Sequence, residues 1–556
     1  TQGRAYRASE RAFQAVVDFY GRTLRWVLGW QLATLLVAVA TLCVTIVLFV
    51  RIPKGFFPIQ DTGVIQGVSE ATQSVSFPEM ASQQQQLAKI ILTDPAVESL
   101  SSFIGIDGTN TTLNSGRILI NLKPIAVRKI GASDVVRRLQ PALAKVPGIT
   151  LFMQPVQDLS VEDRVSRTQF QYTLEDPNQD ELNAFAPRML ARLQQLPELS
   201  DVASDQQVLG LRAKLAFDRN TAARFGITAA AIDQALYDAY GQRQISTMFT
   251  QLNQYHVVLE VQPAFRQSPP SLGDLFIRTI AAPSSTLPGG VAAGGPIQSS
   301  AAFPNGGQIP LNAFSEIQTT TGPITVNHQD QFPVVTLSFN LAPHASLGDA
   351  VTAVNRVREE IGMPASMQAA FQGTAEAFQA SLANEPVLIA AALITVYLVL
   401  GVLYESYIHP ITILSALPSA GVGALVALML CRQDFTVIAL IGIVLLIGIV
   451  KKNAIMMIDF ALAAEREDGM KPEDAIYQAC LLRFRPIMMT TMAALLGAVP
   501  LALSTGSGSE LRRPLGIAII GGLLISQVLT LYTTPVIYIW FDRLATRFSR
   551  HEKAGG

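Results

Sequence analysis

The sequence predicts a membrane bundle of six transmembrane α-helices that carries an α+β domain outside the membrane. Of its 556 residues, 49% are hydrophobic and 15% are charged. This composition is too apolar for an ordinary soluble protein and too charged for a chain that lies wholly in lipid. Apolar runs long enough to span a bilayer lie near both ends of the chain, and the polar region between them alternates strand-like and helix-like segments.

The first elements are an amphipathic basic segment, 1–26, and an apolar span, 27–50. The first residue is Thr and no secretory signal is visible, so we expect the chain to begin in mid-protein. Region 386–541 should hold five more transmembrane helices, and 542–556 a short tail. The five spans are Val387–Tyr404, Ile411–Leu430, Val437–Phe460, Ile487–Leu503 and Leu515–Phe541, of which Ile487–Leu503 is the shortest.

Charge sets the orientation of these spans. Arg and Lys residues gather in the flanking segments 4–25, 466–485 and 543–553, whereas the short opposite loops hold only Arg432, Arg512 and Arg513. The positive-inside rule then predicts cytoplasmic termini and a polar domain outside the cell membrane, in the periplasm of a Gram-negative cell. The net charge of −1 gives no sign of a nucleic-acid partner.

The polar region reads as two similar units. Residues 51–160 follow the order βαββαβ, the ferredoxin-like plan. A second unit of this plan starts in 161–207 and resumes in 328–380, so 208–327 is an inserted module. Within it, the Gly-, Pro- and Ser-rich stretch 280–311 predicts a flexible surface loop.

Two lysines stand inside the apolar span Val437–Phe460. A cation at the bilayer centre costs about 2.5–3.5 kcal/mol and usually faces a bundle interior, with a partner. Lys452 shares its helix face with Gly448, where another helix could pack closely, while Lys451 shares its face with large apolar residues. No other predicted span has an acid in its interior. Either a carboxylate from polypeptide outside this sequence pairs with Lys452, functionally or as a structural ion pair, or the lysine is neutral.

Other polar groups in the spans have two readings each. Thr490 and Thr491 could hydrogen-bond a lysine of a neighbouring helix, or only a carbonyl of their own helix. Arg483 and Arg485 could guide protons at the inner mouth of the bundle, or anchor a helix end at the interface. Enzymatic motifs are missing: there is no GxSxG or HExxH pattern, and the loop from Ser504 lacks the GK[ST] ending of a phosphate loop. We therefore expect a protein that is not an enzyme and has no cofactor or metal centre.

Methionines of the polar region leave one further alternative open. Three of them, if convergent, could bind a soft ion such as copper(I), although core packing explains them more simply. They are Met80, Met153, Met189, Met248, Met363 and Met367.

Several long strings resemble the resistance–nodulation–division (RND) exporters over the whole chain: GIVKKNAIMMIDFA, LLRFRPIMMTT, YESYIHPITILSALPSAG and FFPIQDTG. Within that family, QDLSVEDRVSRTQFQYTLE, GQRQIST, LNQYHVVLE and FALAAEREDGMKPEDAIYQACLLRFRP are most similar to the B-type permeases of Mdt multidrug systems. The resemblance implies the C-terminal half of a proton-driven permease. It also implies a porter domain, in which 208–327 is a docking module.

The resemblance further implies site residues and partners. Lys452, Thr490 and Arg483 match the family's proton relay, with Asn453, Thr491 and Arg485 as possible support. The relay carboxylates belong to the N-terminal half of the same permease. The other implied partners are a second RND permease subunit in a heterotrimer, a periplasmic adaptor protein and a TolC-type outer-membrane channel, around an inner-membrane pump.

One segment departs from the family pattern. Multidrug relatives carry a Phe- and Gly-rich switch loop where this chain reads IDGTNTTLNSG, Ile106–Gly116, and only Phe103 stays nearby as an aromatic residue of a substrate path. A polar loop offers little stacking surface for drugs. Export of amphiphilic compounds is the first hypothesis. A metal-ion RND exporter that uses the outer methionines, and a non-transporting RND-like scaffold for protein or lipid traffic, are the alternatives.

Overall fold

The computed structural model describes residues 4–105, 112–161, 166–266, 268–279 and 307–554. The chain divides into two compact units. One is the inserted segment Gln207–Val326, and the other comprises everything before and after it.

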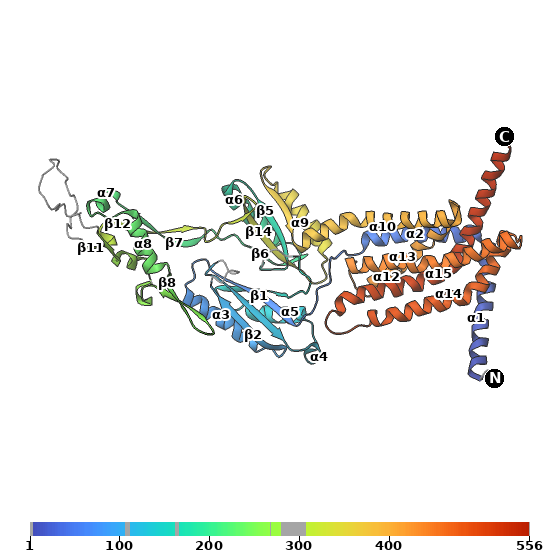
Figure 1. Cartoon of the computed structure of the whole chain (residues 1–556), viewed down its shortest axis with the longest axis horizontal. Helices are drawn as coiled ribbons and strands as arrows, with labels where there is room; N and C mark the ends of the chain where they lie inside the picture. The colour runs from blue at the N-terminus through green and yellow to red at the C-terminus, as the bar shows by residue number, and fades with distance from the viewer. Residues whose placement is uncertain (1–3, 106–111, 162–165, 267, 280–306, 555–556) are drawn as a thin grey trace. The chain divides into compact units, whose positions relative to one another are not determined.

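The helical bundle of the larger unit contains six helical segments that are long and apolar enough to cross a membrane, among the residues described (Figure 1). This number agrees with the six predicted spans. The second of the five late spans is broken at Ser415 into two helices. The bundle helices are α2 (Gln31–Arg51), α10 (Thr374–Tyr404), α11 (Ile408–Leu414), α12 (Leu417–Leu430), α13 (Val437–Glu467), α14 (Pro472–Ala502) and α15 (Ser509–Ala554).

Helix α14 corrects the predicted length of the shortest span. The sequence predicted a helix over Ile487–Leu503, but α14 has 31 residues and starts at Pro472. The predicted start rested on apolarity alone. It was placed too late because the helix also includes a more polar N-terminal part that contains Arg483 and Arg485. Backbone hydrogen bonding continues through this part because charged side chains near a helix end can reach the membrane interface.

Small residues let α15 lie against α12. A Cβ atom at Gly423 would collide with the backbone of Gly521 and Gly522, and one at Gly521 would collide with Ala427. Close backbone approach through small residues is the usual means by which membrane helices associate. Helix α15 also packs on α13 and α14 and is therefore central to the bundle.

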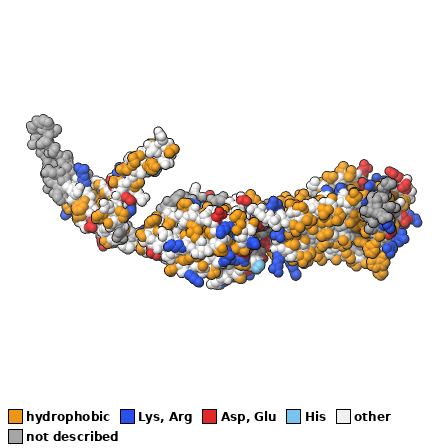
Figure 2. Space-filling model, turned by 90° about the horizontal axis from the view of Figure 1, so that it is seen from below, with side chains coloured by type: hydrophobic (Ala, Val, Ile, Leu, Met, Phe, Trp, Pro, Cys, Tyr) orange, Lys and Arg blue, Asp and Glu red, His pale blue; other side chains and the backbone are white. Residues whose placement is uncertain are grey.

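The outer surface of the bundle is apolar. Helix α2 has no buried residue, and Figure 2 shows hydrophobic side chains over most of the visible bundle surface, with charged residues gathered at its end. Helix α1 (Arg4–Gly29) lies across that end (Figure 1). It is fixed there by Tyr20, which stacks on Phe484 at 4.8 Å between ring centres and donates a hydrogen bond to the Leu531 carbonyl at 2.8 Å.

The first polar subdomain has a four-stranded antiparallel sheet in the order β2-β3-β1-β4, with α3 and α5 packed on it. Its hydrophobic core includes Met80 and Met153, both almost fully buried. Its elements are β1 (Val64–Ala71), α3 (Phe77–Leu92), β2 (Val97–Ile104), β3 (Ser115–Leu122), the single turn α4 (Ile125–Arg128), α5 (Ala132–Leu143) and β4 (Ile149–Pro155).

The second polar subdomain is built from two separate stretches of chain. Strand β14 pairs with β6, β5 and the short β13, and β15 pairs with the other edge of β5, all antiparallel. Its core contains Met189 and Met367, with Met363 packed against it. Its elements are β5 (Phe170–Glu175), α6 (Gln179–Leu193), β6 (Leu199–Ser204), β13 (Asn327–Gln329), β14 (Phe332–Leu341), α9 (Leu347–Ile361) and β15 (Gln368–Gln372).

The inserted unit has its own small core around Ile232, Ile277 and Leu311. Most of the predicted flexible loop, 280–306, lies outside the described residues. The elements are β7 (Gly210–Phe217), α7 (Arg219–Arg224), α8 (Ala229–Tyr240), β8 (Arg243–Phe249), β9 (Gln254–Leu259), the 3-10 turns η1 (Pro263–Arg266), η2 (Pro269–Asp274) and η3 (Leu311–Ala313), and strands β10 (Phe276–Arg278), β11 (Gln308–Pro310) and β12 (Ser315–Gly322). Strand β12 pairs with β7, β8 with β9, and β10 with β11.

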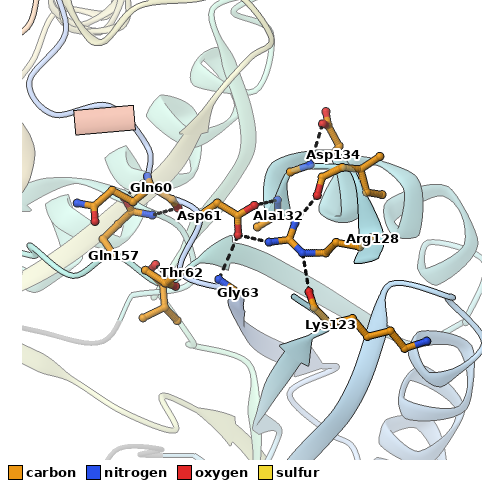
Figure 3. A network of polar contacts seen from close by, with 12 residues as sticks. Gln60, Asp61, Thr62, Gly63, Lys123, Arg128, Ala132, Asp134 and Gln157 are labelled. Carbon is orange, nitrogen blue, oxygen red and sulfur yellow. Dashed lines mark hydrogen bonds and ion pairs between the residues drawn. The ribbon is translucent and has the colours of Figure 1, made fainter. Parts of the chain in front are cut away.

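The linker from α2 to β1 is fixed at both ends. At its start, Lys54 accepts a hydrogen bond from Gly348 N at 3.0 Å through its carbonyl and forms a β-bridge with Phe435. At its end, the Asp61 carboxylate accepts from Ala132 N at the start of α5 (2.9 Å), accepts from Gly63 N (3.1 Å) and pairs with Arg128 (Figure 3). Both members of this ion pair are buried. These contacts hold the end of the linker against the start of α5.

Candidate functional site

The two lysines of α13 differ in exposure, and within this chain Lys451, not Lys452, is partly covered. Lys452 is exposed on the surface of the bundle, whereas Lys451 is half-buried and Ile447 above it is buried. A Cβ atom at Gly448 would meet nothing within 4 Å, so no described helix covers the face that Gly448 shares with Lys452. No described residue packs on this face, and the expectation that another helix covers it stays a prediction. Among the described side chains, no ion pair or hydrogen bond involves Lys452.

The interior of the bundle holds a polar cluster one residue further along α13. Asn453 Nδ2 donates to Thr491 Oγ1 and to Gln527 Oε1, each at 3.2 Å, and Thr491 Oγ1 donates to the same Gln527 oxygen at 2.7 Å. Gln527 Nε2 contacts Met488 Sδ at 3.4 Å. Asn453 and Thr491 are buried. The cluster therefore joins α13, α14 and α15 through groups that would be costly to leave unpaired in a membrane.

The remaining predicted relay residues make contacts of their own. Thr490 donates to the Ile487 carbonyl of its own helix at 3.1 Å. The guanidinium carbon of Arg483 lies 4.2 Å from the centre of the Phe460 ring, a cation–π contact. Arg485 forms a two-pronged ion pair with Glu10 of α1 at 3.1 and 3.4 Å. The structure thus brings Asn453 and Thr491 together, and it does not join Lys452, Thr490 and Arg483 to one another.

The predicted substrate-path residue lies apart from the bundle. Phe103 is on β2 and is 53% exposed. Of the neighbouring polar loop Ile106–Gly116, residues 106–111 lie outside the described part of the chain. The outer methionines occupy separate places: Met80 and Met153 in one core, Met189, Met363 and Met367 in or against another, and Met248 exposed on β8.

Sequence reasoning missed two polar residues. Gln527 lies in the apolar run LLISQVLTLY, where the argument applied to the lysines would have identified it. Glu385 lies two residues before the predicted span Val387–Tyr404. Helix α10 begins eleven positions before Glu385, at Thr374, and Glu385 is only 5% exposed. Glu385 therefore lies within α10, although it falls outside the predicted span Val387–Tyr404, whose interior holds no acid. Glu385 and Lys452 lie on different helices, and no ion pair links them among the described residues.

These observations define what the bundle can do chemically. A mid-span ammonium group on an uncovered helix face can bind an anionic group of whatever element covers that face. The adjacent Asn453 cluster fixes the rotation of α13 against α14 and α15 and so fixes the direction in which Lys452 projects. Neighbouring residues on a helix point about 100° apart, which separates the buried amide from the exposed cation.

A sequence model of the AcrB/AcrD/AcrF family matches residues 1–542. The chain belongs to this family of RND permeases. Two solved structures, both titled as a heavy metal efflux pump in different crystal forms, have the same fold. They superpose with a TM-score of 0.81 at 22% and 23% sequence identity, over 96% of this chain.

The RND permease chain spans about half the length of these solved structures, 52% of one and 53% of the other. At this identity the likeness shows the fold alone. Family membership and the six apolar helices make it a multi-pass membrane protein.

Proposed function

We propose that this chain is the C-terminal half of a proton-driven RND permease that exports amphiphilic compounds, most similar to the B-type permeases of Mdt systems. The observation that carries the proposal is the Lys452 ammonium group, which lies mid-span on an uncovered face without a described partner. Family membership supplies the context, because RND proteins are efflux permeases. Lys452, with Thr490 and Arg483, is proposed as the relay, and Asn453, Thr491 and Arg485 as its support.

The proposed mechanism is an electrostatic switch. A carboxylate of the N-terminal half attracts the Lys452 ammonium group while it is ionised. A proton that binds this carboxylate removes the attraction, and the lysine side chain is released to another position. The covering helix and α13 then adopt a different packing, which the linkers transmit to the polar subdomains.

The remaining assignments follow from this proposal. The permease would lie in the inner membrane, with both polar subdomains in the periplasm, together with a second permease subunit, an adaptor protein and a TolC-type channel. The strand order β2-β3-β1-β4 supports a ferredoxin-like reading of the first subdomain. The inserted unit Gln207–Val326 is proposed as the docking module.

The two adjacent lysines provide the test. In the full-length subunit, expressed with its partner proteins, Lys452→Ala is expected to reduce dye efflux to the level of cells without the pump. Lys451→Ala is expected to retain efflux, because Lys451 lies on a different face of α13. Normal efflux by an assembled Lys452→Ala pump would refute the proposal.

A metal-ion exporter remains the second candidate, because the two solved structures are titled as a heavy metal efflux pump. Substitution of exposed Met248 by Leu tests it without disturbing a core. Loss of copper tolerance in cells that depend on the pump would favour this candidate, and unchanged tolerance would disfavour metal binding at Met248.

A further inference from the structure

A small cavity lies where the α2–β1 linker passes the first turns of α10 and α13. It is lined by the linker residues Lys54 and Gly55, by Phe378 and Glu385 of α10, and by Thr436 and Leu440 at the start of α13, among others. Its volume is about 20 Å³. A space of roughly 10–15 Å³ by this measure holds one water molecule. The cavity therefore has room for a single water molecule.

Glu385 lines this cavity and has an unsatisfied oxygen. The residue is 5% exposed, and its Oε1 atom is buried without a hydrogen-bond partner in the described part of the protein. An unpaired buried polar atom destabilises the folded protein, and more so if it is charged. Such an atom in a native structure calls for a donor that the protein itself does not provide.

Among the described residues that line the cavity, Lys54 is the one other titratable residue. Its Nζ atom lies 4.7 Å from the centre of the Phe49 ring, and no described ion pair joins it to Glu385. An ammonium group and a carboxylate that share a cavity without touching are suited to bridging by one water molecule. The Thr436 hydroxyl, which accepts a hydrogen bond from Ala439 N at 3.4 Å, can donate its own proton to the same water.

Apart from Lys54, no charged side chain lines the cavity among the residues that the structure describes. The lining residues of α13 are uncharged. Asp434 lies beside Gly55 but is not among the lining residues, and Asp349 of α9 lies near enough to Asp434 to act on its charge. The charge state of this site is therefore set mainly by Glu385 and Lys54.

We propose that this cavity is a proton-binding site, in which one water molecule held between Lys54 Nζ and Glu385 Oε1 passes a proton to the carboxylate. The inference rests on the proposed proton-driven function and adds a second proton site to it, at the junction with the polar subdomains. A proton from bulk water reaches the cavity water, which transfers one proton to Oε1 and is regenerated. The carboxylate becomes a neutral carboxylic acid, and Lys54 is left without its counter-charge.

This protonation acts on the linker. The backbone of Lys54 is bound to α9 through Gly348 N and to the start of α13 through Phe435. Loss of the attraction between Lys54 and Glu385 loosens α10 from this junction, while the backbone bonds remain. The site would thus report the outer proton concentration at the point where the bundle meets both polar subdomains.

Infrared difference spectroscopy of the purified 556-residue chain tests the proposal without any transport assay. Between about pH 4 and pH 9, a carboxylic-acid carbonyl band that appears on acidification should be lost in Glu385→Gln. It should be kept in Glu376→Gln, which removes an exposed acid of the same helix. In Lys54→Met the band should persist with its midpoint at higher pH, because the carboxylate loses its cation.

Two results would overturn the proposal: identical spectra for wild type and Glu385→Gln, or a band in Lys54→Met with an unchanged midpoint. Glu385→Asp, which keeps the acid on a shorter side chain, serves if Glu385→Gln does not fold, and it must change the position of the band. If no carboxylic-acid band depends on Glu385 while Lys452→Ala loses efflux, the result refutes the Glu385 site alone. A band at Glu385 with normal efflux in Lys452→Ala would refute the proposed relay instead.

Discussion

Lys452 and Asn453 are consecutive residues of α13 with opposite surroundings: one is exposed, and the other is buried in a hydrogen-bonded cluster. The buried Asn453 amide limits the rotation of α13, because rotation about the helix axis would break the hydrogen bonds of this amide to Thr491 and Gln527. The direction of the cation therefore depends on a residue of α15 that carries no charge.

Gln527 tests this dependence. Replacement by Leu removes the oxygen that both Asn453 and Thr491 use, and we expect a destabilisation of about 1 kcal/mol, the usual order for polar contacts between membrane helices. Val528→Leu, at an exposed position next to it, should be neutral. Unfolding of the purified chain in detergent measures both. In a double-mutant cycle, Asn453→Leu should cost less in the Gln527→Leu background; strict additivity would show that the cluster is not coupled.

We predict that stability around Asp205, which follows β6 just before the inserted unit in the sequence, depends on pH. Its carboxylate accepts from Thr336 N and from Asn327 Nδ2, both at 2.7 Å, yet burial raises its pKa above the ordinary value. Folding then favours the protonated acid, so this contribution is present at low pH and is lost as pH rises through the raised pKa. In Asp205→Asn the charge is absent. Amide protection of 199–206 and 332–341 should exceed that of wild type at pH 8, and the difference should shrink near pH 4; a constant difference would contradict this.

Among the elements, the start of α5 is the clearest case of an anchor. The Asp61 carboxylate joins the linker from the membrane to Arg128 and to the first amide of the helix (Figure 3). Arg137, on the same helix, forms an exposed pair with Asp134. The two pairs have the same chemistry and differ in burial.

This contrast gives a matched pair of variants. Arg128→Met leaves a buried carboxylate without its cation, and breaking a buried pair costs about 3–5 kcal/mol, partly offset here by two backbone donors. We expect hydrogen exchange in 131–136 to accelerate on the order of 100-fold if the opening is local. Arg137→Met should change exchange less than about threefold, because exposed pairs contribute about 0–1 kcal/mol. Equal effects of the two variants would refute the anchor.

The elements also show what can be predicted from the sequence. Apolar length identified the six spans, because lipid requires a long helix wherever the backbone crosses it. It failed at Arg483 and Glu385, because a helix continues beyond the apolar residues and carries charged ones at its ends. Lys452, Thr490 and Arg483 were identified as polar residues in or beside apolar spans, and their joint role as a relay came from a resemblance. The cluster at Gln527 instead depends on which faces of three helices meet. Periodicity within one helix does not contain that information.

At the scale of the whole molecule, the bundle has two kinds of glycine face. Gly423 lies in a contact that admits no side chain, between α12 and α15. Gly448 lies on the open face with Lys452. If the full permease covers this face, both glycines allow close helix packing. Gly423 does so between two helices of this chain, and Gly448 does so between this chain and the remainder of the subunit.

The variant Gly448→Leu distinguishes packing within this chain from packing against the remainder of the subunit. In the 556-residue chain it should leave unfolding in detergent unchanged within about 0.5 kcal/mol, whereas Gly423→Leu should destabilise the chain by about 1–3 kcal/mol through overpacking. In the full-length subunit, Gly448→Leu should abolish efflux, since its side chain occupies the space of the covering helix and displaces a carboxylate from Lys452. If the full-length Gly448→Leu pump works normally, the face lies against lipid. Lys452 must then reach the interface by extending its side chain, and it cannot be the relay.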